Sequence, residues 1–338
     1  MSAGAYRGYG ATQGIFAVES TVNKLADRLS MDPIVLRQKN MIHEGDVMPA
    51  YYGETANSCR LEECLLKASD MIGWKEKGMR TVMPDGKIRA RGVAMAMQGS
   101  SISNCDVGSV TVKLSDEGTY HITVGCTDMG TGCDTIIAQF AADVLETPID
   151  NISVYGVDTD ISPYDSGSYA SSTTYLTGMA AVKACEQLRE RIIALAAVRM
   201  NKDASALTFD GENVIDESDG AKMSLFDIAT ASMCNNEISL EVTYSHSSPV
   251  SPPPFMAACA EIEADPETGA IELLDYTACV DCGTVVNTNL ARVQTEGGLL
   301  QGIGMTLYED IWYDERGKNL SNSFMQYKVP SRLDTDRI

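Results

Sequence analysis

A glycine-rich loop at residues 8–14, GYGATQG, carries the first candidate site. Arg7 and two tyrosines, Tyr6 and Tyr9, lie in or beside it. Its spacing differs from the GxGxxG of a dinucleotide fold, and no strand has room to precede it. Because glycine permits a ligand to approach the backbone closely, the loop predicts either a site where a ring stacks on a flat substrate or a structural turn.

Residues 128–135, DMGTGCDT, form a second candidate. Two glycines directly before a predicted helix leave backbone N–H groups unpaired, and the helix dipole favours negative charge there. No lysine follows the second glycine, so a P-loop is excluded. The segment predicts a site for a phosphate-bearing ligand other than a nucleoside triphosphate, or a tight strand-to-helix turn.

Two further segments combine small or polar residues with a helix. SGSYASSTT at 166–174 can cap a long helix and can also donate to an anion. VQTEGGLLQGIG at 293–304 places Gln294, Glu296 and Gln301 on one helix with four glycines. Each glycine disfavours a helix by about 1 kcal/mol, so another backbone or a ligand is expected to come close to this helix.

Other site chemistries find little support. The single CxxC, Cys279 to Cys282, has no second pair at zinc spacing. The three histidines, His43, His121 and His246, lie far apart in the sequence. No GxSxG motif is present, so nothing supports a serine hydrolase.

Composition narrows the class of protein. The chain has 338 residues, 44% of them hydrophobic, and a formal net charge of -21. That charge argues against non-specific binding to nucleic acid or to an anionic membrane surface. No apolar run approaches the ~20 residues of a membrane span, and the N-terminus lacks signal-peptide features. Ten cysteines fit a cytoplasmic protein with reduced thiols, the alternative being a secreted disulfide protein.

The elements that must position these segments can be read from periodicity. Apolar residues at helical spacing predict a helix over 15–29, and Asp32-Pro33 predicts the start of a short helix ending at Gln38. Residues 45–58 look like a loop, and a helix is expected over 61–72. The stretch 73–92 looks like a linker to a new unit.

Beyond that stretch, the same order of elements occurs twice. Alternating runs around Ser115–Gly118 predict a hairpin, followed by the 128–135 loop and a helix over 135–145. A strand, NISVYGVD, and a long helix over 172–199 come next. A second hairpin around 265–269, a loop and a helix over 290–307 repeat the order. The repetition suggests a weak internal duplication, and the irregular interleaving predicts an α+β fold.

Several motifs together resemble a known family. AYRGYGATQGIFAVES, LADRLSMDPIVLRQKN, TDMGTGCDT, GSYASSTTYLTGMAAV and VDCGTVVNTNLARVQTEGGLLQGIGMTLYED, ending in YKVP, are similar to the molybdopterin-binding subunit of the xanthine dehydrogenase and aldehyde oxidase family. The resemblance implies the α+β molybdenum-cofactor domain of that family. It places the end of a first cofactor-binding subdomain at 1–75, a linker at 76–90 and a second, C-terminally incomplete subdomain at 91–338.

The resemblance also implies roles for individual residues. Arg7 corresponds to the loop whose backbone faces the oxo or sulfido ligands of the molybdenum, and Tyr9 to an aromatic ring against the substrate. Gly99 and Ser100 fall near a substrate-lining segment. The family often has glutamine where Thr131 stands. The remaining positions that the resemblance assigns to the pterin cofactor are Met129, Gly130, Thr131, Gly132, Ala170, Ser171, Thr173 and Gln294.

The same resemblance implies what this chain leaves to other segments. The family's molybdenum is held by a pterin dithiolene, so no direct protein ligand is expected, and the pterin can be a mononucleotide or a cytosine dinucleotide. The catalytic glutamate base is expected beyond Ile338, since Glu19, Glu296 and Glu309 do not match its position. The rest of the molybdenum domain, the iron–sulfur clusters and the FAD are expected on partner segments, so the chain is not expected to work alone.

The implied reaction is oxidative hydroxylation with water as the oxygen source. The substrate would be a purine, another N-heteroaromatic such as nicotinate, or an aldehyde. One alternative is a carbon monoxide dehydrogenase large subunit, although that group has a cysteine where this chain has Gly8. Another is a non-catalytic remnant or assembly module that binds no cofactor.

Overall fold

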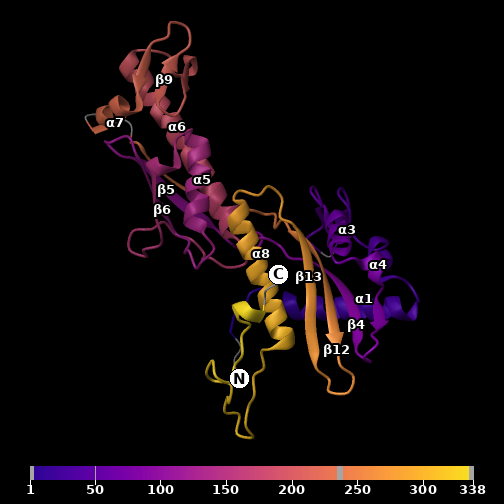
Figure 1. Ribbon diagram of the computed structural model, residues 1–338. Helices are drawn as coiled ribbons and strands as arrows, with labels where there is room; N and C mark the ends of the chain where they lie inside the picture. Colours follow the sequence, from indigo (N-terminus) through magenta and orange to yellow (C-terminus); the bar gives the residue numbers. More distant parts are fainter. Residues whose placement is uncertain (1–3, 50, 234–238, 335–338) are drawn as a thin grey trace. The chain divides into compact units, whose positions relative to one another are not determined.

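A computed structural model describes residues 4–49, 51–233 and 239–334, and the chain divides into two compact units (Figure 1). Unit 1 comprises Met1–Gln98 and Pro253–Ile338, and unit 2 comprises Gly99–Pro252. Unit 2 is therefore inserted between two segments of unit 1. Both units mix helices with mainly antiparallel strands, so the expected α+β class is confirmed.

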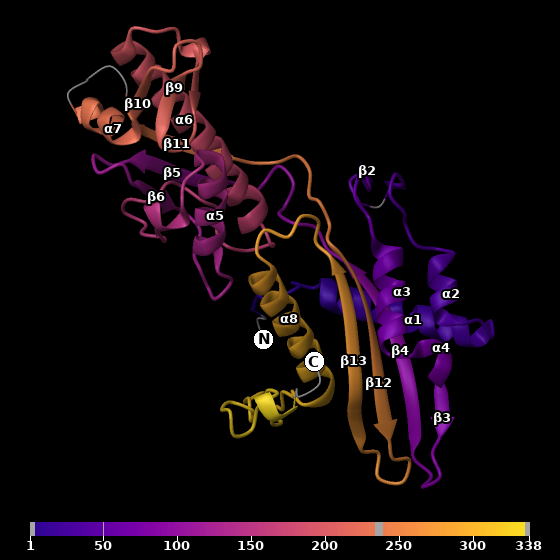
Figure 2. The same ribbon diagram turned by 45° about the horizontal axis from the view of Figure 1, so that its top comes forward.

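Unit 1 is built on a four-stranded antiparallel sheet in the order β13-β12-β4-β3. These strands are Ile271–Asp281, Phe255–Ala264, Ile88–Met97 and Arg80–Val82. Helix α3 (Leu61–Met71) packs against β12 and β13, as Figure 2 shows. The core between them consists of Ile34, Cys64, Leu65, Ala68, Ile72, Trp74, Val93, Ala257 and Cys259.

Two helices at the start of unit 1 are joined to β4 by the partly buried carboxylate of Glu19. Helix α1 spans Ala11–Arg28 and α2 spans Pro33–Gln38. Glu19 Oε2 on α1 accepts hydrogen bonds from Arg37 Nη2 at 2.6 Å and from the backbone N–H of Met95 at 2.7 Å. Asp32 caps α2 by accepting from the N–H of Ile34 at 2.7 Å, as the Asp-Pro pair predicted.

Two stretches of unit 1 differ from the sequence-based expectations. Much of the 76–90 segment, expected to be a linker, is ordered structure: the end of α4 (Trp74–Lys77), strand β3 and the start of β4. The alternating pattern of 88–97 was missed because its small residues, such as Ala94 and Ala96, carry little hydrophobic contrast. The expected loop at 45–58 contains a short ladder, β1 (Val47–Met48) with β2 (Glu54–Thr55).

The last part of unit 1 is helix α8 (Thr288–Leu307), followed by an extended segment with a short helix, η4 (Arg332–Asp334). Only Ile303 and Gly304 of α8 are buried. The segment after it includes an isolated bridge between Tyr313 and Asn319. The predicted helix over 290–307 is confirmed.

Unit 2 has its own sheet in the order β11-β5-β6-β7. The strands are Glu241–His246, Gly108–Leu114, Tyr120–Val124 and Ile152–Tyr155. The predicted hairpin is confirmed as β5 with β6, closed by the Gly118 N–H donating to Ser115 O at 3.1 Å. Strand β7 lies parallel to β6 because α5 (Cys133–Leu145), with a 3-10 turn η1 (Ile149–Asn151), forms the crossover between them.

Helix α6 (Gly178–Met200) forms the centre of the unit 2 core and packs against α5, β5 and β11. It begins with a π-helical turn, η2 (Thr173–Thr177), so the helix predicted over 172–199 is confirmed apart from this wider first turn. A Cβ at Gly108 would lie 2.5 Å from the Thr177 backbone nitrogen, which explains the glycine. The remaining elements are η3 (Ala204–Ala206), β8 (Leu207–Phe209), β9 (Asn213–Asp216), β10 (Lys222–Ser224) and α7 (Leu225–Met233).

The order hairpin, loop, helix that the sequence predicted twice is present in both units, as β5-β6-α5 and as β12-β13-α8. The nine cysteines of the described residues are free thiols. Among the helices of the described part, none is both long and apolar enough to cross a membrane.

Candidate functional site

The loop at residues 6–10 holds its aromatic ring outward on a strained backbone. Gly8, Tyr9 and Gly10 all have positive φ angles, of 95°, 40° and 90°. Glycine is favoured at position 8 by its φ, and a Cβ there would lie 2.3 Å from Thr12 Oγ1, which would have to move. Tyr9 is 79% exposed, which leaves its ring free of packing partners within unit 1.

Arg7 connects this loop to α8. Its Nη2 donates to the backbone oxygen of Gln294 at 2.9 Å and lies 3.4 Å from Gln294 Oε1. A Cβ at Gly298 would lie 3.2 Å from Arg7 Nη1, so the guanidinium rests against the glycine face of the helix. Two segments that the sequence analysis assigned separately to one cofactor, 287 residues apart, are thus in direct contact.

The start of α1 gives the loop an electropositive end. The N-cap residue Gly10 offers no side-chain cap, and the first turn of this 18-residue helix contains no acidic residue. The partial positive charge of the helix N-terminus is therefore not neutralised by the helix itself. Residues 8–10 lie directly at that end.

In unit 2, hydrogen bonds join the three segments that the sequence analysis assigned to cofactor or substrate. The Ser101 N–H donates to Ala170 O at 2.8 Å, which joins the 99–101 turn to the 166–173 strip. The Thr127 N–H donates to Ser168 Oγ at 2.7 Å, and Ser168 Oγ donates to Thr127 O at 3.0 Å. The same strip is thereby joined to the 128–132 turn.

Several residues of this unit 2 cluster have left-handed backbones. Ser101, Ala170 and Ser171 have φ angles of 75°, 51° and 57°. Such angles cost non-glycine residues free energy and concentrate at functional sites. Thr173 begins the π-helical turn, a feature that also occurs often at functional sites.

The turn at 128–132 differs from the expected phosphate site in one respect. Asp128 Oδ1 accepts the N–H groups of Gly130 at 2.8 Å and Gly132 at 3.1 Å, so these two donors are already engaged. Burial would raise the pKa of Asp128, but the hydrogen bonds from Gly130 and Gly132 outweigh it, and the pKa lies below its usual value. The carboxylate is therefore ionised at neutral pH, and the turn offers an anion fewer N–H donors than the sequence suggested.

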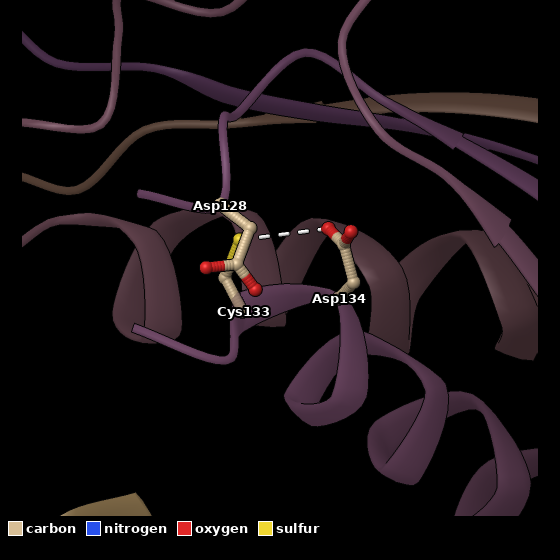
Figure 3. Close-up of side chains that lie close together, drawn as sticks. All are labelled: Asp128, Cys133 and Asp134. Atoms are coloured by element: carbon tan, nitrogen blue, oxygen red, sulfur yellow. Dashed lines mark hydrogen bonds between the residues drawn. The ribbon is translucent and has the colours of Figure 1, made fainter. Parts of the chain in front are cut away.

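Asp128, Cys133 and Asp134 converge at the start of α5 (Figure 3). Their ligand atoms lie within 4.8 Å of one another. Cys133 Sγ donates to Asp134 Oδ1 at 3.6 Å. Burial raises the pKa of Asp134, and the charge of Asp128 adds to this. A thiol and two carboxylates could in principle hold a cation, but one Asp128 oxygen is already engaged by the turn.

The structure adds residues that the sequence analysis did not select. Gln98 Nε2 donates to Gly8 O at 3.4 Å, and Ser168 connects two loops. Ser101 is 6% exposed, and its Oγ has no hydrogen-bond partner among the described residues. Sequence reasoning could have found Gln98 and Ser101 only from their position beside the selected pair Gly99-Ser100. The fold is needed to show what they contact.

Comparison with known proteins shows the family of the chain. A family model described as a molybdopterin cofactor-binding domain matches residues 67–335, and another of the same description matches residues 1–41. The chain belongs to the molybdopterin cofactor-binding domain family.

Relatives within the wider family are oxidoreductases by name. The chain is 35% identical, over 99% of its length, to "probable hypoxanthine oxidase XdhD" of Escherichia coli K12, and covers 36% of that protein. It is 30% identical, over its full length, to a xanthine dehydrogenase molybdenum-binding subunit of Escherichia coli O157:H7, and covers 46% of it. The molybdopterin-binding chain thus spans between a third and a half of the length of these relatives.

Solved structures show the same fold. The structure matches reconstituted CO dehydrogenase from Oligotropha carboxidovorans with a TM-score of 0.84 at 25% identity, covering 99% of this chain and 44% of that one. Quinoline 2-oxidoreductase from Pseudomonas putida 86 matches with a TM-score of 0.84 at 24% identity, over 98% and 45% of the two chains. The fold of both units is therefore that of the molybdopterin-binding domains.

Proposed function

We propose that this chain supplies cofactor- and substrate-contacting segments of a molybdenum hydroxylase of the xanthine dehydrogenase type. The reaction would be the oxidative hydroxylation of a purine, another N-heteroaromatic or an aldehyde, with water as the source of oxygen. Membership of the molybdopterin-binding family and the names of the relatives support this class.

The observation that carries the proposal is the contact between Arg7 and Gln294. Both residues were assigned to the cofactor from the sequence alone. In the structure they are already in contact, through a hydrogen bond of 2.9 Å from Arg7 Nη2 to Gln294 O. In unit 2, the bonds between Ser101 and Ala170 and between Thr127 and Ser168 support the same assignment for the other segments.

The residues of this chain would have distinct tasks. The backbone of residues 7–10, at the uncapped start of α1, suits the electron-rich oxygen or sulfur ligands of the metal group. The exposed ring of Tyr9 would stack on a flat substrate and hold the reacting carbon in place. Met129–Gly132 and Ala170, Ser171 and Thr173 would contact the pterin, and Gly99 and Ser100 the substrate. The molybdenum–pterin group, when bound, supplies the acceptor for two electrons from the substrate.

Partners would complete the enzyme. We propose that the glutamate base, the iron–sulfur clusters and the FAD lie on other segments or subunits, and that the pterin is held as a mononucleotide or a cytosine dinucleotide. A cytoplasmic location is proposed as well, because nine of the ten cysteines are described and all nine are free thiols, as in a reducing compartment.

Gly8 supports a hydroxylase over a carbon monoxide dehydrogenase. Proteins with that activity have a similar loop, but a cysteine directly follows the arginine in it. At Gly8, the φ of +95° disfavours a cysteine, and Thr12 Oγ1, 2.3 Å from the position of a Cβ, would have to move.

The proposal predicts the origin of the oxygen in the product. The complete enzyme containing this sequence would be incubated with hypoxanthine, nicotinate or a simple aldehyde, an electron-accepting dye and water labelled with oxygen-18. One labelled oxygen is expected in the hydroxylated product of at least one substrate. Unlabelled product, or turnover of carbon monoxide alone, would contradict the hydroxylase assignment.

A further inference from the structure

The role of the Arg7 side chain follows from where it lies. Arg7 is an exposed residue, but its guanidinium reaches α8 and donates to Gln294 O at 2.9 Å. A Cβ at Gly298 would approach Arg7 Nη1 to 3.2 Å and Arg7 Cζ to 3.3 Å, so the guanidinium would have to shift by a few tenths of an ångström. Gly297 also faces this group, with Arg7 Nη1 3.9 Å from the position of its Cβ.

The backbone of the same loop has two further supports. Gln98 Nε2, one residue past the end of β4, donates to Gly8 O at 3.4 Å. Thr12 Oγ1 donates to Arg7 O at 3.4 Å. Two carbonyls of the loop, Arg7 O and Gly8 O, thus accept bonds from α1 and from the residue after β4, and the Arg7 side chain donates to α8. The three consecutive positive φ angles of residues 8–10 lie beside these supports.

We infer that Arg7 is a positioning residue, whose guanidinium, seated on Gly297 and Gly298 of α8, fixes the backbone of residues 7–10 and the outward ring of Tyr9. The importance of this fixed loop for catalysis rests on the proposed function, because the loop is the one assigned to the metal group and the substrate. Gly298 acts through Arg7, and Gln98 provides the second support. The space that a planar guanidinium needs explains Gly298, whereas a Cβ at Gly297 would make an ordinary contact of 3.9 Å with Arg7 Nη1.

A double-mutant cycle in the full chain tests this inference without any cofactor. The variants are Arg7→Ala, Gly298→Val and the two combined, with Gly302→Val as the matched control. Gly302 lies on the same helix, but nothing lies within 4 Å of the position of its Cβ. Both valine variants therefore share the same helix propensity, and only one displaces the guanidinium.

The measurement is backbone hydrogen exchange, resolved for the peptide covering residues 4–14. Its reporters include the N–H of Tyr9, which donates to Tyr6 O at 2.8 Å, and that of Ala11, which donates to Gly8 O at 3.0 Å. Arg7→Ala and Gly298→Val are each expected to speed exchange about tenfold, with Gly302→Val like wild type. The double variant should exchange no faster than Arg7→Ala, because both changes remove one contact.

Other outcomes overturn the inference. Additive effects in the double variant would show that Gly298 acts independently of Arg7. Equal exchange in Gly298→Val and Gly302→Val would show that the glycine pair is not a platform. If Arg7→Ala lowered the melting temperature and sped up exchange throughout unit 1, Arg7 would have a stabilising role only. Arg7→Met, which keeps the aliphatic stem, should then restore stability. Since no cofactor is present, these results do not depend on whether the complete enzyme hydroxylates anything.

Discussion

At the scale of single residues, Tyr9 is the position at which the proposed substrate site can be tested most directly. Its positive φ of 40° is a strained conformation of a kind that concentrates at functional sites, and its 79% exposure leaves the ring accessible to a ligand. A stacked aromatic pair contributes about 0.5–1.5 kcal/mol, which corresponds to about two- to tenfold in kcat/KM.

Tyr9→Ala is therefore expected to lower kcat/KM for a heteroaromatic substrate by about tenfold or more, since positioning is lost as well as stacking. Tyr9→Phe should keep the fold and the cofactor while reducing turnover of polar rings by a smaller factor, because only the O–H is lost. Both would be measured in the complete enzyme at matched molybdenum content. Tyr52→Ala is the control, because Tyr52 is also exposed and has a φ of 56°. If Tyr9→Ala behaves like Tyr52→Ala, the ring does not contact the substrate.

Residue-level expectations from the sequence differ in how far the structure supports them. Arg7 and Gln294 are in contact, and the 99–101, 127–132 and 166–173 segments are joined by hydrogen bonds. The expectation that Gly130 and Gly132 offer free N–H groups was incomplete, because Asp128 accepts both. An aspartate that precedes a turn can accept hydrogen bonds from the N–H groups of that turn, and the sequence pattern does not show whether it does.

At the scale of elements, the glycines of α8 differ in the groups that lie beside them. Gly298 faces Arg7, whereas a Cβ at Gly304 would lie 2.3 Å from Glu309 Oε1 and 2.8 Å from Pro330 Cδ. The segment after the helix thus folds back on its last turn, where Tyr327 Oη also donates to Glu309 Oε2. No close neighbour explains Gly302 among the described residues.

These differences predict opposite effects on stability. Gly302→Ala should raise the free energy of unfolding by up to about 1 kcal/mol, because alanine favours a helix and meets no neighbour. Gly304→Ala should lower it, because Pro330 is rigid and must move together with Glu309. Chemical unfolding of the full chain, followed by circular dichroism, measures both. Stabilisation by both variants would contradict the packing of the 309–330 segment on α8.

Most elements could be predicted from periodicity and turn residues. Both hairpins, α2 with its Asp32 cap, and helices α3, α5, α6 and α8 lie close to the expected ranges. Strand β3 and the start of β4 were taken for a linker, because the stretch PDGKIRARG is polar and glycine-bearing yet pairs within a sheet. Tertiary pairing rather than local propensity places these residues in strands.

At the scale of the whole molecule, the sequence order does not reveal that unit 2 is an insertion. Strand β4 ends at Met97 and its partner β12 begins at Phe255, with unit 2 between them. Such long-range pairing cannot be derived from local patterns, so the expected division near residues 76–90 does not coincide with the boundaries of the compact units. Only the resemblance to the family placed segments from both parts of the chain on one cofactor.

The molybdenum and pterin content of the complete enzyme tests this account most directly, with Asp128→Ala compared against Asp210→Ala. Each aspartate accepts two backbone N–H groups of a turn in unit 2, Asp128 from Gly130 and Gly132 and Asp210 from Glu212 and Asn213. Only the first turn belongs to the segments assigned to the cofactor. The account predicts near-stoichiometric molybdenum and pterin in wild type and Asp210→Ala, and less than half of that in Asp128→Ala, with the circular dichroism of all three alike. Full cofactor content in Asp128→Ala, or no pterin in the wild-type enzyme, would contradict it.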